Sequence, residues 1–123
     1  MPEKMQATVM PGIESRRIQL YSFAACRFLN WNVVFACENV LIAYTPRRWS
    51  HGEDVVTIET TDHQLHITSR SCNESFDFTG RYRKHISSLI GAINIVRESD
   101  MRQWNFELER LLEFSMQSVE RAS

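Results

Sequence analysis

Four strand-like segments follow one another between residues 31 and 71, and this succession constrains the fold more than any other feature. Residues 31–37 and 40–45 are mostly apolar, whereas apolar and polar residues alternate in 54–61 and 64–71. Polar links with the composition of turns and loops join each segment to the next. Because short links place consecutive strands side by side in opposite directions, the sequence predicts a four-stranded antiparallel meander.

The first predicted strand is apolar on both faces, which is typical of a strand inside a sheet. Strict alternation puts Trp31, Val33, Phe35 and Cys37 on one face and leaves Val34 and Ala36 for the other. In residues 54–61 and 64–71, by contrast, one face is apolar and the other polar. The sheet is therefore expected to bury one face and to leave much of the other in water.

Helical periodicity flanks the meander on both sides. Residues 15–29 form one amphipathic pattern, and a second runs from a cap at Asp77 or Thr79 to Val96. A third begins at Asp100 and continues to about residue 120. The fold class that follows is α+β, a two-layer sandwich in which helices cover one face of the meander and an extra C-terminal helix is added.

The third helix has no obvious place in this sandwich. The second helix carries a small face, Ser88, Gly91 and Ile95, that favours packing with another element. The third helix is expected either on this face or against a second copy of the protein. Phe106 and Phe114 fall off its main apolar stripe, so a helix packed on one side only would leave them in water.

Three regions are predicted along the chain. Residues 1–13 contain Pro2, Pro11 and Gly12 with no sustained period, so they are expected to be a mobile N-terminal arm. Residues 14–97 form the α-β4-α domain, and residues 98–123 form the C-terminal amphipathic helix. A chain of 123 residues, of which 43% are hydrophobic, fits one domain with its own core.

Charge and cysteine content narrow the class of protein. The net charge of −1 provides no field that would attract nucleic acid or an anionic membrane, so nucleic acid is not an expected partner. The N-terminus lacks the apolar core of a signal peptide, and no apolar run is long enough for a membrane span. Three widely spaced cysteines without a CxxC pair are typical of reduced thiols. The expectation is a soluble, cytoplasmic protein.

Catalytic and metal-binding patterns are not found in the sequence. Cys26 and Cys37 lie in apolar patterns that keep a thiol inert, which leaves Cys72 as the nucleophile candidate. His63 and His66 are three positions apart, so on a strand they point to opposite faces and do not chelate together. We therefore expect a protein that is not an enzyme and that has no cofactor, no catalytic residue and no metal site.

The cluster Arg81, Arg83 and Lys84 opens the second predicted helix, with His85 beside it. A helix N-terminus already carries partial positive charge, so unpaired cations there are unfavourable by about 0.3–1 kcal/mol each. One interpretation is pairing with Glu74, Asp77 or the acidic C-terminal helix. The other is an anion site, in which helix N–H groups and arginine side chains hold a phosphate or carboxylate.

The polar loop that follows residue 45 carries a second candidate group, Arg47, Arg48 and Trp49. The two arginines would add to an anion site if the loop lies near the start of the second helix. Trp49 is flanked by polar residues, so it either folds back over the edge of the sheet or anchors a partner.

Several motifs in this order, LNW, LIAYTPRRW, VVTI, LHITSRS and DFTGRYRKHI, carry a resemblance to a known family. Over residues 18–96 the chain resembles a small bacterial α-β4-α domain of unknown function, similar to domains appended to some rhomboid-type membrane proteins. The resemblance implies the same fold and a non-enzymatic role, and it names no ligand.

Two hypotheses of function follow. The first is a non-enzymatic cytoplasmic module that binds an anionic group or a protein partner through Arg81, Arg83, Lys84, Arg47, Arg48 and Trp49. The alternative is a structural or regulatory protein that forms a homodimer through the C-terminal helix. A small enzyme that uses Cys72 or the histidines is the least favoured reading.

Overall fold

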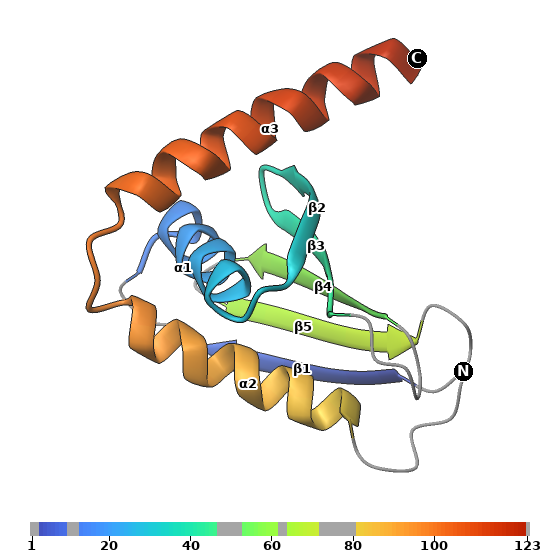
Figure 1. Ribbon diagram of the computed structural model, residues 1–123, viewed down its shortest axis with the longest axis vertical. Helices are drawn as coiled ribbons and strands as arrows, with labels where there is room; N and C mark the ends of the chain where they lie inside the picture. Colours follow the sequence, from blue (N-terminus) through green and yellow to red (C-terminus); the bar gives the residue numbers. More distant parts are fainter. Residues whose placement is uncertain (1–2, 10–12, 47–52, 62–63, 72–80, 123) are drawn as a thin grey trace.

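The protein is an α+β structure with one antiparallel sheet, as the computed structural model shows for residues 3–9, 13–46, 53–61, 64–71 and 81–122 (Figure 1). Four strands form the predicted meander: β2 (Asn32–Cys37), β3 (Val40–Tyr44), β4 (Asp54–Thr61) and β5 (Gln64–Ser71). Each pairs antiparallel with the next in the chain. The predicted two-layer sandwich with a C-terminal helix is confirmed.

A fifth strand, β1 (Glu3–Val9), extends the sheet beyond β5, so that the strand order is β1-β5-β4-β3-β2. It runs antiparallel to β5 with Glu3 opposite Arg70 and Val9 opposite Gln64. The prediction that residues 1–13 form a mobile arm is thus corrected for residues 3–9. Their backbone groups form the ladder with β5, which needs little apolar side-chain surface.

A β-bulge interrupts β2 between Val33 and Phe35, where the register with β3 shifts by one residue. Val33 lies opposite Ala43 and packs against the core, whereas Phe35 lies opposite Ile42 on the other face. The prediction that Val33 and Phe35 share a face is therefore wrong, because the extra residue of a bulge reverses the alternation. Val34, at the bulge, is 39% exposed.

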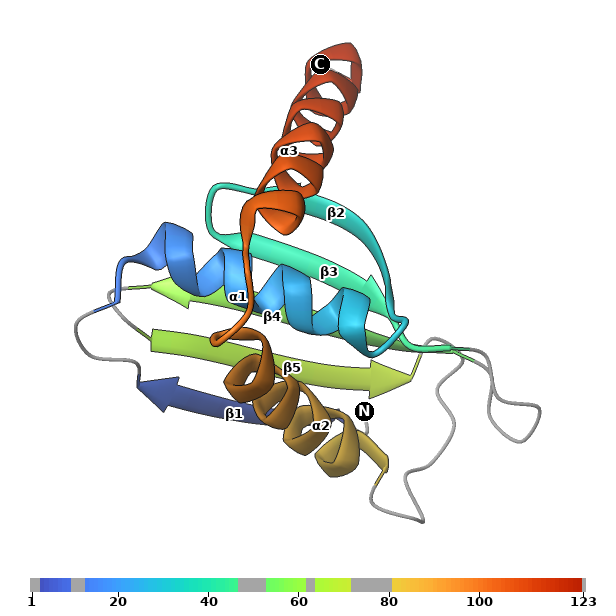
Figure 2. The same ribbon diagram turned by 60° about the vertical axis from the view of Figure 1, so that its left-hand side comes forward.

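Two helices, α1 (Ser15–Phe28) and α2 (Arg81–Val96), cover one face of the sheet (Figures 1 and 2). Between them and the strands lies the core, which includes Ile18, Leu41, Ile58, Ile67 and Leu89, all 1% exposed or less. Within the described part of the chain, the opposite face of the sheet carries no helix.

The third helix, α3 (Arg102–Ala122), packs beside α1 and over β2 rather than on α2 (Figure 2). The expectation that the small face of α2 receives it is wrong, since Ser88 and Gly91 are exposed and Ile95 is 56% exposed. Among the described side chains of α3, Leu108 is fully buried in the core, and Trp104, Leu111 and Leu112 are partly buried and pack against the core.

α3 also covers the free edge of the sheet at β2. The backbone N–H of Ala36 donates to Ser115 Oγ at 3.3 Å, and both residues are buried. The carbonyl of Cys37, on the same strand, accepts a hydrogen bond from the buried amide of Gln19 on α1. Side chains of two helices therefore satisfy backbone groups that an edge strand would otherwise offer to another chain.

Candidate functional site

The predicted basic residues divide by how the structure describes them. Arg83 and Lys84 lie in the first turns of α2 and are exposed. Arg81 is the first residue of this helix, but its side chain lies outside the described part. Arg47, Arg48 and Trp49 lie outside the described residues altogether, as do Cys72, Glu74 and Asp77.

Beneath the start of α2 the structure places a contact between a buried carboxylate and an imidazole. His85 Nε2 lies 2.8 Å from Oδ2 of Asp54, the first residue of β4. The Asp54 side chain is fully buried, and the His85 side chain is 19% exposed. A hydrogen bond to a buried carboxylate is stronger than one in water, so this contact ties the first turns of α2 to the sheet.

The ring of Trp31 completes this cluster. It meets the His85 ring edge-on, with centroids 5.9 Å apart and planes at 89°. Trp31 reaches this position because α1 ends in a left-handed turn at Asn30, where φ is 60°. The Trp31 N–H donates to Cys26 O and the Asn30 N–H to Arg27 O, which is the Schellman pattern of helix termination.

Asp54 is also hydrogen-bonded to Thr45, and these two residues flank the loop that carries Arg47 and Arg48. Its backbone N–H donates to Thr45 Oγ1 at 3.0 Å, and its carbonyl accepts from the Thr45 N–H at 2.9 Å. The loop that carries Arg47 and Arg48 leaves the sheet at Thr45 and returns at Asp54. Both ends of this loop therefore lie at the end of the sheet where α2 begins.

Two acidic residues of α3, the helix that was one of the expected partners of the α2 cluster, pair with α1 instead. Glu107 and Glu109 of α3 pair with Arg27 and Arg16 of α1, at 3.7 and 3.6 Å. Of the described residues, no acid forms an ion pair with Arg83 or Lys84. Within the described part of α3, the acidic side chains therefore do not neutralise these two cations.

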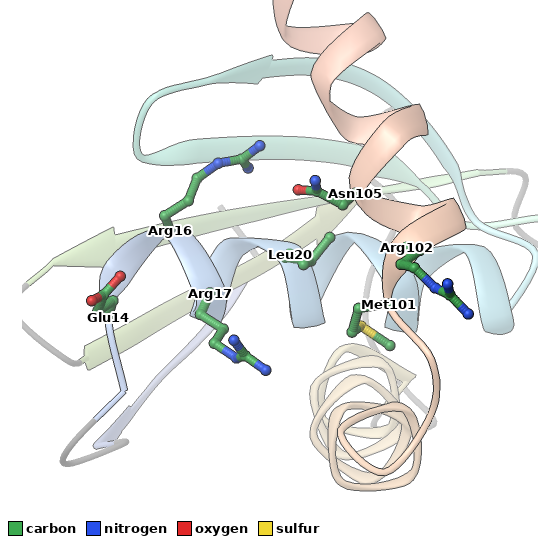
Figure 3. Close-up of a pocket in the computed structure, with 7 residues that line it drawn as sticks. All are labelled: Glu14, Arg16, Arg17, Leu20, Met101, Arg102 and Asn105. Atoms are coloured by element: carbon green, nitrogen blue, oxygen red, sulfur yellow. The ribbon is translucent and has the colours of Figure 1, made fainter.

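A second group of arginines surrounds a cleft of about 380 Å³ between α1 and the start of α3 (Figure 3). The first turns of α1 and the residue before them supply Glu14, Arg16, Arg17 and Leu20. The start of α3 supplies Met101, Arg102 and Asn105. The sequence interpretation missed this site, although Arg16 and Arg17 open a helix just as Arg81 and Arg83 do.

The three arginines of this cleft differ in their partners. The Arg102 side chain donates hydrogen bonds to the Asp100 carboxylate, and the Arg102 backbone N–H donates another. Together these hydrogen bonds lower the pKa of Asp100 to about 2. Arg16 is 3.6 Å from Glu109. Arg17 instead donates its Nε–H to the Tyr21 hydroxyl at 2.9 Å, and this hydrogen bond raises the pKa of Arg17.

Metal binding has no geometric support in the described residues, where no group of three His, Cys, Asp or Glu side chains is placed to hold an ion. His66 contacts Gln64, with 3.2 Å between Nε2 and Oε1, and His51 and His63 lie outside the described part.

No described helix is long and apolar enough to cross a membrane.

Comparison with protein-family models, with curated proteins and with solved structures finds no match for this chain. The resemblance to the bacterial α-β4-α domain therefore stays a prediction.

Proposed function

We propose that this chain is a non-enzymatic interaction module that binds an anionic group at the end of the sheet where α2 begins. The observation that carries the proposal is that Arg83 and Lys84 are exposed at a helix start and have no acidic partner among the described residues. The anionic group is carried by a small ligand or by an acidic segment of a protein partner.

Two features of the structure support this location. The contact between His85 and Asp54 fixes the first turns of α2 against the sheet, so the cations of this helix are presented on a rigid element. The ends of the loop with Arg47 and Arg48 meet at the same place through the hydrogen bonds of Thr45 and Asp54. We also propose a cytoplasmic location, because Cys26 and Cys37 are free thiols.

The test is the double variant Arg81→Ala/Arg83→Ala, with Arg97→Ala, an exposed arginine after the other end of α2, as the matched control. The probes are inorganic phosphate, pyrophosphate and a fluorescent poly-glutamate peptide. We expect the double variant to weaken binding of at least one probe by about tenfold or more, the loss of one charge-assisted hydrogen bond. Its melting temperature should change by less than about 2 °C.

The control should bind as the unmodified protein does. Equal binding by the double variant, or no binding of any probe to the unmodified protein, would contradict the proposal. A large fall in melting temperature would show that the two arginines serve the fold instead.

A second candidate function is self-association through α3. Phe106 and Phe114 are each 64% exposed and Met116 is 60% exposed, although all three are large apolar side chains. In a homodimer these side chains would lie against a second copy, and the mass of the protein in solution tests this.

A further inference from the structure

We propose that the cleft between α1 and the start of α3 is a second binding site, for a small organic acid with an apolar chain. Its carboxylate is held by Arg17, and its chain rests on Leu20 and Met101 (Figure 3). This site shares no residue with the anion site proposed at the start of α2, so it is independent of the function proposed there.

The shape and floor of the cleft favour a ligand with an apolar body. Its volume of about 380 Å³ lies within the range of small-molecule sites. Leu20 and Met101 line it, are half-buried and pack against the core, so they form a fixed apolar surface. An inorganic anion would leave this surface in water, whereas an alkyl chain would remove it from water.

Arg17 is the arginine of this cleft that contacts a neutral group and, among the described residues, no carboxylate. The Tyr21 hydroxyl accepts its Nε–H, and its guanidinium lies 5.8 Å from the centre of the Tyr21 ring. These contacts orient the side chain without neutralising its charge and leave the Nη–H groups for a carboxylate. Arg16 and Arg102, in contrast, already contact the carboxylates of Glu109 and Asp100.

The start of α1 adds to the attraction for an anion. Its first turn contains no acidic residue, and the side chain of the N-cap residue Glu14 makes no capping hydrogen bond. The partial positive charge of the helix N-terminus therefore adds to that of Arg17.

Glu14 is the competing acid on the rim of the cleft. Its effect on the pKa of Arg17 is smaller than that of the Tyr21 hydroxyl, and Figure 3 shows the two charged side chains pointing in different directions. Glu14 therefore weakens an anion site here without filling it, so Glu14→Gln should strengthen the binding of an acid.

Binding of octanoate to the full chain, followed by calorimetry and by NMR shifts of the Leu20 and Met101 methyl groups, tests the proposal. We expect 1-octanol, which has the same chain without the charge, and inorganic phosphate to bind about tenfold or more weakly than octanoate. Arg17→Gln should weaken octanoate by a similar factor, while Arg97→Gln leaves it unchanged. Glu14→Gln should strengthen it about two- to fivefold.

Tyr21→Phe separates positioning from fold, because the ring stays in the core while the acceptor for Arg17 is lost. We expect this variant to keep its circular dichroism spectrum and to bind octanoate several-fold more weakly. The proposal is wrong if octanoate does not bind, if 1-octanol binds equally well, or if a folded Arg17→Gln variant binds octanoate as tightly as the unmodified chain.

Discussion

Cys26 lies on α1 with its side chain completely buried, and this burial raises the pKa of its thiol from 9.0 to about 12. In the folded protein the thiol therefore stays protonated. The unfolded chain loses this proton above pH 9, so the contribution of Cys26 to stability is complete below pH 9 and is lost as the pH rises toward 12.

We therefore predict that Cys26 is not alkylated in the folded protein at pH 8, whereas the partly exposed Cys37 is. Mass spectrometry after labelling with iodoacetamide locates the modified residue. Above pH 9 the free energy of unfolding should fall by up to ~1.4 kcal/mol per pH unit more in the unmodified protein than in Cys26→Ala. Labelling of Cys26 at the rate of Cys37 would mean that the helix does not bury it.

For single residues, the sequence pattern predicted which side chains are buried better than it predicted which side chains contact one another. The apolar positions around Cys26 and Cys37 indicated inert thiols. Burial gives a physical reason for this at Cys26, whereas Cys37 is only partly buried, so the expectation does not hold for it. The contact between His85 and Asp54 was not predictable, because it joins residues 31 positions apart from a helix and a strand. The arginines at the start of α1 could have been recognised in the sequence, since Arg16 and Arg17 open a helix just as Arg81 and Arg83 do.

In the described part of α3, Leu108 is the apolar side chain that is fully buried. Leu108 is fully buried between this helix and the core, whereas Phe106 on the same helix is 64% exposed. Leu108→Ala leaves a cavity and removes apolar contacts, so we predict a loss of about 2–5 kcal/mol in the free energy of unfolding.

Phe106→Ala is the matched control and, in a monomeric chain, should change this free energy by no more than about 0.5 kcal/mol. Urea denaturation of both variants measures the difference. Equal values for Leu108→Ala and Phe106→Ala would mean that α3 is not docked through Leu108.

Periodicity located the elements but not their neighbours. The apolar stripe of α3 predicted a packed helix, but the same stripe could pack against α2 or against α1 and β2. β1 had a weak signal, since Met5, Ala7 and Val9 alternate with polar residues, but Pro2, Pro11 and Gly12 outweighed it. The bulge in β2 has no such signal, because apolar residues occupy both faces of this strand.

For the whole molecule, the exposed apolar residues of α3 lead to a prediction about its mass. If α3 pairs with a second copy, light scattering should report a dimer, and Phe106→Glu/Met116→Glu should convert it to a monomer by placing charges in the interface. Ser88→Glu, on the exposed face of α2, is the control and should leave the mass unchanged. A monomeric mass for the unmodified protein at micromolar concentration would exclude this dimer.

The meander and its helical layer were predictable because strand pairs and amphipathic helices with short links allow few arrangements. The position of α3 and the cleft were not, since each depends on contacts between α1 and residues 80 or more positions later.

Because Ser115 and α3 cover the edge strand β2, that edge is unprotected while the chain is being synthesised. All five strands precede α3 in the sequence, so on the ribosome the sheet can form before the helix that covers its edge has emerged. During that interval the Ala36 N–H has no partner from Ser115, and the nascent sheet presents an edge to which other chains can add. Proteins translated from truncated mRNAs that end before α3 would therefore aggregate, even though they contain all strands of the sheet.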